Sequence, residues 1–143
     1  MIIPGHGTLI AYESATPGTY TPVYQIVSID APEIVNGQAD STLLTSATKK
    51  SRATIPDCGE LSMTGFYDPK DVTHIKLFDL LKTGAEVNWQ LSFNDAAVLA
   101  DKSHWIFPGY VKSAKPTGVE VDGNLGLDLV VVLNDFPVQT PRT

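Results

Sequence analysis

The amino-acid sequence predicts a mainly β domain, a β-sandwich or partial barrel with one flanking α-helix. Two stretches of alternating apolar side chains carry this prediction, residues 87–93 and residues 125–133. Only residues 69–82 show the spacing of apolar residues that is typical of a helix. With about seven strand-like segments around that helix, we expect a single domain spanning residues 1–143.

The N-terminal part of the sequence predicts two strands joined by a turn. Residues 7–12 form a short strand, and two prolines with a glycine mark a turn over residues 14–22. Residues 23–29 alternate, and both sides of this strand carry apolar side chains. We therefore expect the strand to be covered on both faces.

A long segment over residues 32–54 lacks the period of either a helix or a strand. It contains Asn36-Gly37, which favours a hairpin turn, and Leu43 and Leu44 as its bulky apolar residues. Loops of this length are uncommon in a compact domain and are usually functional or disordered. Near its end lies a basic cluster formed by Lys49, Lys50 and Arg52. These residues could belong to a solvated loop or could contact a partner, and both interpretations stay open.

A strand over residues 60–68 precedes the helix. Asp68 suits the N-cap, Pro69 suits the first helical position, and Gly84 suits the C-terminal stop. The helix carries an apolar stripe that we expect to anchor it to the sheet, formed by Ile75, Leu77, Phe78 and Leu81. Two further apolar residues lie off this stripe and indicate a second contact surface, Val72 and Leu80.

The C-terminal half predicts further strands. Residues 87–93 are expected to place one face in the core, through Trp89, Leu91 and Phe93. Pro108-Gly109 interrupts the next strand, which should be bulged or lie at an edge. Two more segments complete the chain, a hairpin over residues 119–134 and an extended polar tail over residues 135–143.

Composition excludes several classes of protein. The net charge of −6 argues against a partner that is gripped through its phosphates. Cys58 is the only cysteine, so no internal disulfide can form. The N-terminus has no basic and apolar pattern typical of a signal peptide, and no apolar run reaches the length of a membrane helix. We expect a soluble protein that does not insert into membranes.

The sequence gives no pattern typical of catalysis. It contains no nucleophile elbow, no phosphate-binding loop and no paired cysteine or histidine spacing. His6, His74 and His104 fall in different predicted elements, and His74 is expected to be buried or at the edge of the helix stripe. The scattered carboxylates could include a glycosidase pair, although most of them sit at predicted turns and caps. We therefore expect no enzyme, no cofactor and no metal.

The order of these elements resembles the tail tube protein of long-tailed bacteriophages, and more distantly the tube protein of the type VI secretion system. The resemblance is carried by a strand that runs into a long loop, by an Asp-Pro before the single helix, and by the helix, glycine stop and strand that follow. The stretches involved are residues 24–32, Asp40-Ser41-Thr42-Leu43, residues 57–68, residues 84–95 and residues 123–134.

The resemblance implies a structural virion protein and a hexameric ring. In such a ring, sheets pair edge to edge into a larger inner β-barrel, and rings stack into a tube around a tape-measure protein. It also implies terminator and initiator proteins as partners, DNA passing through the lumen without tight binding, and assembly in the host cytoplasm before residence in the tail. Candidate interface residues are Asp40, Thr42, Leu43, Leu44, Lys49, Lys50, Arg52, Val72 and Leu80.

Two alternatives stay open beside this resemblance. The first is a monomeric β-sandwich that binds carbohydrate or another surface, with Tyr67, Trp105 and Tyr110 as a stacking platform. The second is a tube protein of the type VI secretion kind. Self-assembly separates a tube protein of either kind from a monomeric binding module.

Overall fold

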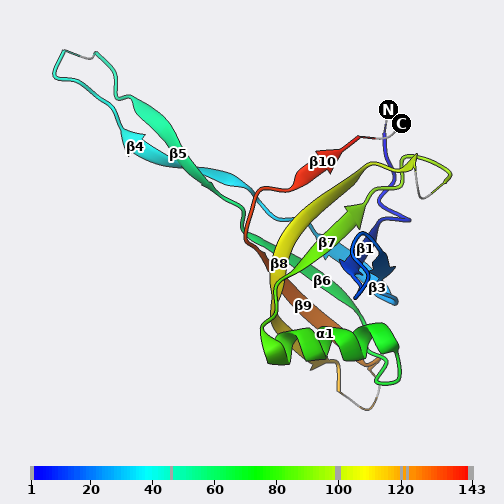
Figure 1. Ribbon diagram of the computed structural model, residues 1–143. Helices are drawn as coiled ribbons and strands as arrows, with labels where there is room; N and C mark the ends of the chain where they lie inside the picture. Colours follow the sequence, from blue (N-terminus) through cyan, green and yellow to red (C-terminus); the bar gives the residue numbers. More distant parts are fainter. Residues whose placement is uncertain (1, 46, 99–100, 120, 122, 142–143) are drawn as a thin grey trace.

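The protein is described here by a computed structural model that covers residues 2–45, 47–98, 101–119, 121 and 123–141. Figure 1 shows a β-rich body, one helix at its lower end, and a long two-stranded arm that projects from it. The elements in chain order are β1 Leu9–Glu13, β2 Tyr20–Pro22, β3 Ile26–Asp30, β4 Val35–Asp40, β5 Ser51–Asp57, β6 Glu60–Phe66, α1 Val72–Thr83, β7 Val87–Ser92, β8 His104–Thr117, β9 Gly126–Leu133 and β10 Val138–Thr140.

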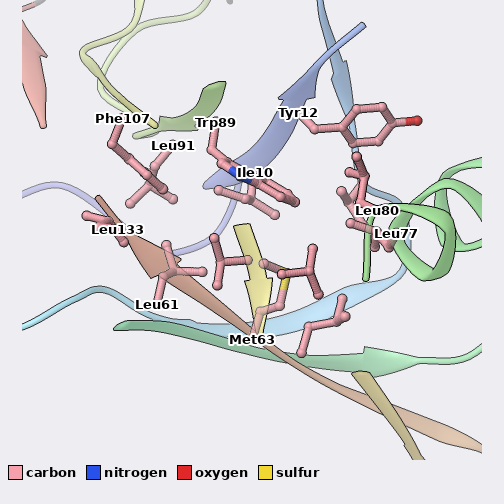
Figure 2. Packing of buried hydrophobic residues seen from close by; sticks show 14 of the residues in the cluster. Ile10, Tyr12, Leu61, Met63, Leu77, Leu80, Trp89, Leu91, Phe107 and Leu133 are labelled. Carbon is pink, nitrogen blue, oxygen red and sulfur yellow. The ribbon is translucent and has the colours of Figure 1, made fainter. Parts of the chain in front are cut away.

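The body is one antiparallel sheet with the strand order β2-β1-β7-β8-β9-β6-β3, and β10 pairs with the start of β8. Strand β8 belongs to both halves of this sheet, because its first part pairs with β7 and its second part pairs with β9. The two halves face each other across a common core, as Figure 2 shows. The sheet does not close on itself, which confirms the expected sandwich with one flanking helix.

The core follows from the alternation in the sequence. Trp89 and Leu91 of β7 are fully buried, and Trp89 Nε1 donates to the carbonyl oxygen of Gly109 at 3.1 Å. Phe93, just beyond β7, is half-buried against this core. Strand β9 supplies every second side chain to the opposite layer, namely Leu127, Leu129, Val131 and Leu133. Both alternating stretches therefore face the core as expected, except that Leu125 precedes β9 and is 37% exposed.

The helix begins later than the sequence indicated. Asp71, not Asp68, is the N-cap, and its Oδ1 accepts from the Thr73 backbone nitrogen at 2.9 Å and the Thr73 hydroxyl at 2.6 Å. Pro69 lies outside the helix, in the turn that Asp68 closes by accepting from the backbone nitrogen of Lys70 at 3.0 Å. Asp71 takes the N-cap position because its extended backbone (ψ of 124°) points the carboxylate at the first turn of the helix.

The face that α1 buries also differs from the predicted stripe. Ile75 is 48% exposed, whereas Leu80 is only 4% exposed and Leu77 is fully buried. The reason is angular: Ile75 lies two residues, or about 200°, from Leu77, while Leu80 lies three residues away on the same face. Ile75 is thus not a core anchor and Leu80 is not an interface residue. Phe78 and Leu81 pack against the core at its margin.

The strand expected over residues 23–29 is shortened by a local backbone constraint. The strand predicted from residue 23 begins only at Ile26, because Gln25 has a left-handed backbone (φ of 63°) that interrupts the extended chain. Here β3 comes so close to β6 that a Cβ on Gly65 would collide with the backbone of Gln25. The expected cover on both faces is wrong, since no residue of β3 is fully buried and Val27 is 66% exposed.

Of the two alternatives expected for this strand, an edge position is wrong, because β8 lies between β7 and β9, whereas β8 does contain a bulge, although not at Pro108-Gly109. Pro108 faces Asn88 of β7, and the carbonyl oxygen of Pro108 accepts from Asn134 on the other side at 3.0 Å. Since the N–H and C=O of a strand residue point the same way, the proline removes no bond from the β7 ladder. The register shift in β8 lies further on, between Val111 and Ser113.

The last predicted hairpin pairs differently. Strand β9 pairs with the far end of β8, up to Thr117 opposite Gly126, so no separate strand forms at Val119 or Val121, which are exposed. The predicted turn at Asp122-Gly123-Asn124 includes Asp122, which lies outside the described residues. The C-terminal tail holds the short strand β10.

Candidate assembly surface

Most of the segment expected as a loop over residues 32–54 belongs to a regular β-hairpin. Strands β4 and β5 pair only with each other and form the arm in Figure 1. Six to seven strand residues give the ladder a length of about 20 Å. Every residue of β5 is exposed and none of β4 is fully buried, so the arm contributes no residue to the core of the body.

The dipeptide Asn36-Gly37 does not form the hairpin turn. It lies inside β4, where the pairing register shifts between Asn36 and Gln38 and produces a bulge. A Cβ on Gly37 would collide with the Thr54 hydroxyl, so glycine is needed there for the close approach of β5. The chain reverses further out, between Asp40 and Ser51.

Thr42 ties the two sides of the arm together just beyond its strands. Its hydroxyl accepts from the Lys50 backbone nitrogen at 2.7 Å and donates to the Lys50 carbonyl oxygen at 3.0 Å. The Thr42 backbone nitrogen donates to Asp40 Oδ1 at 2.9 Å, and this bond lowers the pKa of the Asp40 carboxyl. These bonds hold the base of the arm tip, which is defined here as residues 41–50.

Exposed apolar side chains mark the arm. Leu44 in the tip is fully exposed and Leu43 beside it is 69% exposed. Nearer the body, Ile55 is 87% exposed and Val35 is half exposed. An isolated two-stranded hairpin is marginally stable in water, and these side chains add apolar surface that another molecule can cover.

The basic cluster lies on the same arm. Lys49 and Lys50 are the last two residues of the tip, and Arg52 lies in β5 opposite Ala39, all with exposed side chains. They stand out in a chain with a net charge of −6. Seven of the nine predicted interface residues thus lie on this arm. Of the two on the helix, only Val72 is exposed, at 76%.

The alternative stacking platform does not form. Tyr67 stacks on His74 with ring centroids 6.0 Å apart and contacts Phe78 edge-on. Tyr110 pairs, through Val132, with the Glu60 end of β6, whereas Tyr67 follows the other end of that strand. Trp105 packs edge-on against Phe93. The three rings therefore present no common surface.

The titratable side chains are dispersed through the described residues. His74 is fully buried in α1, as expected, while His6 precedes β1 and His104 opens β8. Burial raises the pKa of the Cys58 thiol, with Asp135 and Asp57 adding to the effect, which disfavours a thiolate nucleophile. Among the residues whose placement is described, no group of three or more histidine, cysteine or carboxylate side chains could hold a metal ion.

Comparison with known families decides the identity of this fold. A model of the lambda-like phage tail tube family matches residues 6–124. The chain belongs to the phage tail tube family. A comparison with curated protein sequences gives no match. Within the described residues, no helix of this tail tube protein is long and apolar enough to cross a membrane.

Solved structures show the same fold. The tail of an empty gene transfer agent particle, refined with C6 symmetry, has a TM-score of 0.78 at 14% identity and covers 96% of this chain and 98% of its own. The tail tube of SPP1 has a TM-score of 0.70 at 14% identity, covering 99% of this chain and 80% of its own. A type six secretion system protein is more distant, with a TM-score of 0.52 at 14% identity over 88% and 78% of the two chains.

Proposed function

We propose that this tail tube protein assembles into rings of six subunits that stack into a hollow tube, through which the viral genome leaves the particle. The observation that carries this proposal is the arm, which contributes no residue to the core of the body and ends in exposed leucines and lysines. A gene transfer agent tail of the same fold has C6 symmetry, which supports the number of subunits.

Ring closure would be made by the edges of the sheet. Strands β2 and β3 end the strand order of the body, so each presents one edge without a partner strand in the described part of the chain. Such edges promote aggregation unless something pairs with them. Pairing between neighbouring subunits removes the edges and joins six sheets into one inner β-barrel.

Stacking of rings would be made by the arm. The chain would form a single domain over residues 1–143. From it the segment 32–54, which includes the start of β5, reaches beyond the body and can contact the next ring. A marginally stable hairpin is ordered fully only when its apolar side chains are covered, so assembly contributes the missing stabilisation. Lys49, Lys50 and Arg52 favour an acidic surface on the neighbouring ring, and Val72 on the helix is a further candidate contact.

The tube would guide DNA rather than bind it. A net charge of −6 disfavours attachment to phosphates, so duplex passes without a tight contact. We place a tape-measure protein in the lumen during assembly, terminator and initiator proteins at the tube ends, and assembly itself in the host cytoplasm. The role is structural and requires no catalysis.

Light scattering across a concentration series tests the role of the arm. The full chain should form high-mass polymer, whereas a variant in which a two-residue turn replaces residues 41–50 should stay folded and fail to stack. Hydrogen exchange adds a local measure: amides of β4 and β5 should exchange fast in free subunits and slowly in polymer, while β7 stays protected in both. Normal tube growth by the shortened variant would contradict a stacking role for the arm tip.

A further inference from the structure

The body carries an apolar groove that the mechanism of ring closure does not use. It has a volume of about 530 Å³ and lies between the N-terminal segment, β3 and β7. Ile26, Val27 and Ile29 of β3 form one side. Val27 is 66% exposed, and Ile3, across the groove, is 45% exposed. A groove with this lining favours aliphatic side chains.

The arm tip offers side chains of that kind. Leu43 and Leu44 stand at the end of the arm, and the Thr42 bonds to Lys50 fix the base from which they project. Because this base is already ordered, docking costs less conformational entropy than it would for a free loop. Apolar residues at a preorganised tip are suited to insertion into an apolar pocket.

Charges beside the two surfaces are complementary. Asp30 is exposed and lies in the sequence between Ile29 and Ala31, which both line the groove, and exposed Glu33 follows. Lys49 and Lys50 flank the leucines at the tip. A tip seated in the groove would bring opposite charges together at its rim, which favours one orientation and speeds the encounter.

The occupant must be a second copy of the chain. Figure 1 shows the arm leaving the body on the side away from β1 and the two termini, and β4 and β5 pair only with each other. The tip therefore points away from its own groove. A contact between two different surfaces of identical chains is heterologous, so it propagates from copy to copy, and between stacked rings it continues along the tube.

We propose that Leu43 and Leu44 of one subunit insert into the groove beside β3 of another subunit. This inference rests on the proposed assembly and adds the surface on which the arm tip docks. It makes β3 a strand with two roles, since its free edge is offered to one neighbour and its groove-lining side chains receive the arm of another.

Disulfide trapping tests the contact. A Leu44→Cys/Val27→Cys double variant, assembled and then oxidised, should give a ladder of covalent dimers, trimers and longer chains on a denaturing gel without reductant. The matched control is Leu44→Cys/Lys76→Cys, which moves the second cysteine to an exposed position on α1 that is not a candidate contact and should give no ladder. The single variants Leu44→Cys and Val27→Cys show whether the native Cys58 forms any of the cross-links. Polymer without a ladder, or equal ladders from the two pairs, overturns the proposal.

Two further measurements separate this inference from the assembly itself. Leu44→Ser should raise the concentration needed for polymerisation about ten- to a hundredfold, as expected from losing one buried leucine. A thiol reagent should label Val27→Cys in free subunits and fail to label it in tubes. Protection of Val27→Cys without a cross-link to Leu44→Cys would show that a different segment covers the groove, which contradicts the proposal. A chain that never polymerises overturns the proposed function and this contact together.

Discussion

The imidazole of His74 in α1 donates from Nε2 to the carbonyl oxygen of Tyr24, 2.9 Å away. The direction of this bond follows from the other ring nitrogen, because Nδ1 accepts from the backbone nitrogen of Asp68 at 3.1 Å and so carries no proton. One buried side chain thus joins three segments: the helix, the turn before it, and the strained turn before β3.

His74→Ala should destabilise the folded protein by about 2–4 kcal/mol, because two backbone groups lose their partners and a buried cavity remains. His74→Phe should keep the stacking on Tyr67 and still lose most of this stability. The measurement is the free energy of unfolding in urea. His6→Ala, at an exposed residue, is the control and should change it by less than about 0.5 kcal/mol. Equal midpoints for His74→Ala and His6→Ala would refute the role of the imidazole.

The N-cap of α1 should make stability depend on pH in the acid range. The hydroxyl of Thr73, and then its backbone N–H, lower the pKa of the Asp71 carboxyl. A carboxyl with a lowered pKa in the folded state contributes stability above its ordinary value near 3.9, and this contribution is lost as the pH falls through the lowered pKa. Asp71→Ala should therefore cost about 1 kcal/mol at pH 7 and progressively less below about pH 4.

Asp68→Ala is the matched control for the cap, since the sequence alone favoured Asp68. Its carboxylate bonds only to the Lys70 backbone nitrogen in an exposed turn. Thermal unfolding at pH 7 and pH 3 should show the smaller change for Asp68→Ala. A larger loss at Asp68 than at Asp71 would place the start of the helix where the sequence suggested.

The buried face of the helix gives a direct comparison between neighbouring residues. Leu77→Ala should cost about 2–5 kcal/mol, because Leu77 is fully buried and its removal leaves a cavity. Ile75→Ala should cost less than about 1 kcal/mol, since Ile75 is 48% exposed. Urea denaturation measures both, and a reversed order would show that the helix is rotated about its axis.

How much of this could be predicted from the sequence depends on which interactions are local. The alternation around Trp89 and in β9 is set by the two-residue period of a strand, and Gly84 ends the helix through its own left-handed backbone, with φ of 67°. Both were predictable. The mixed stripe of α1 was misjudged because Leu80 and Ile75 are equally apolar, and only the position of the sheet decides which is covered.

The arm could not be recognised from periodicity. No residue of β4 or β5 is fully buried, so the arm lacks the alternation of buried and exposed side chains that β6 shows. Asn36-Gly37 suggested a turn, but the bulge at Gly37 is produced by the approach of Thr54 from the partner strand. The groove beside β3 could not be predicted from local sequence patterns either, because residues 3–8, 26–31 and 91–93 meet there only in the folded chain.

The base of the arm tip should matter for assembly and not for the fold. Thr42→Val keeps the shape of the side chain and removes both bonds to Lys50, which increases the entropy that docking must overcome. We expect slower tube growth by light scattering and an unchanged melting temperature of the free subunit. Thr45→Val, in the same tip, is the control. Identical growth rates for the two variants would mean that the Thr42 bonds do not organise the tip.

Electron microscopy of the purified, concentrated protein tests the central claim most directly. End views should show closed rings with six-fold symmetry around a hollow lumen, and side views should show these rings stacked into tubes, with the arm between successive rings. A strictly monomeric species at high concentration, even with tail initiator proteins present, would contradict the account.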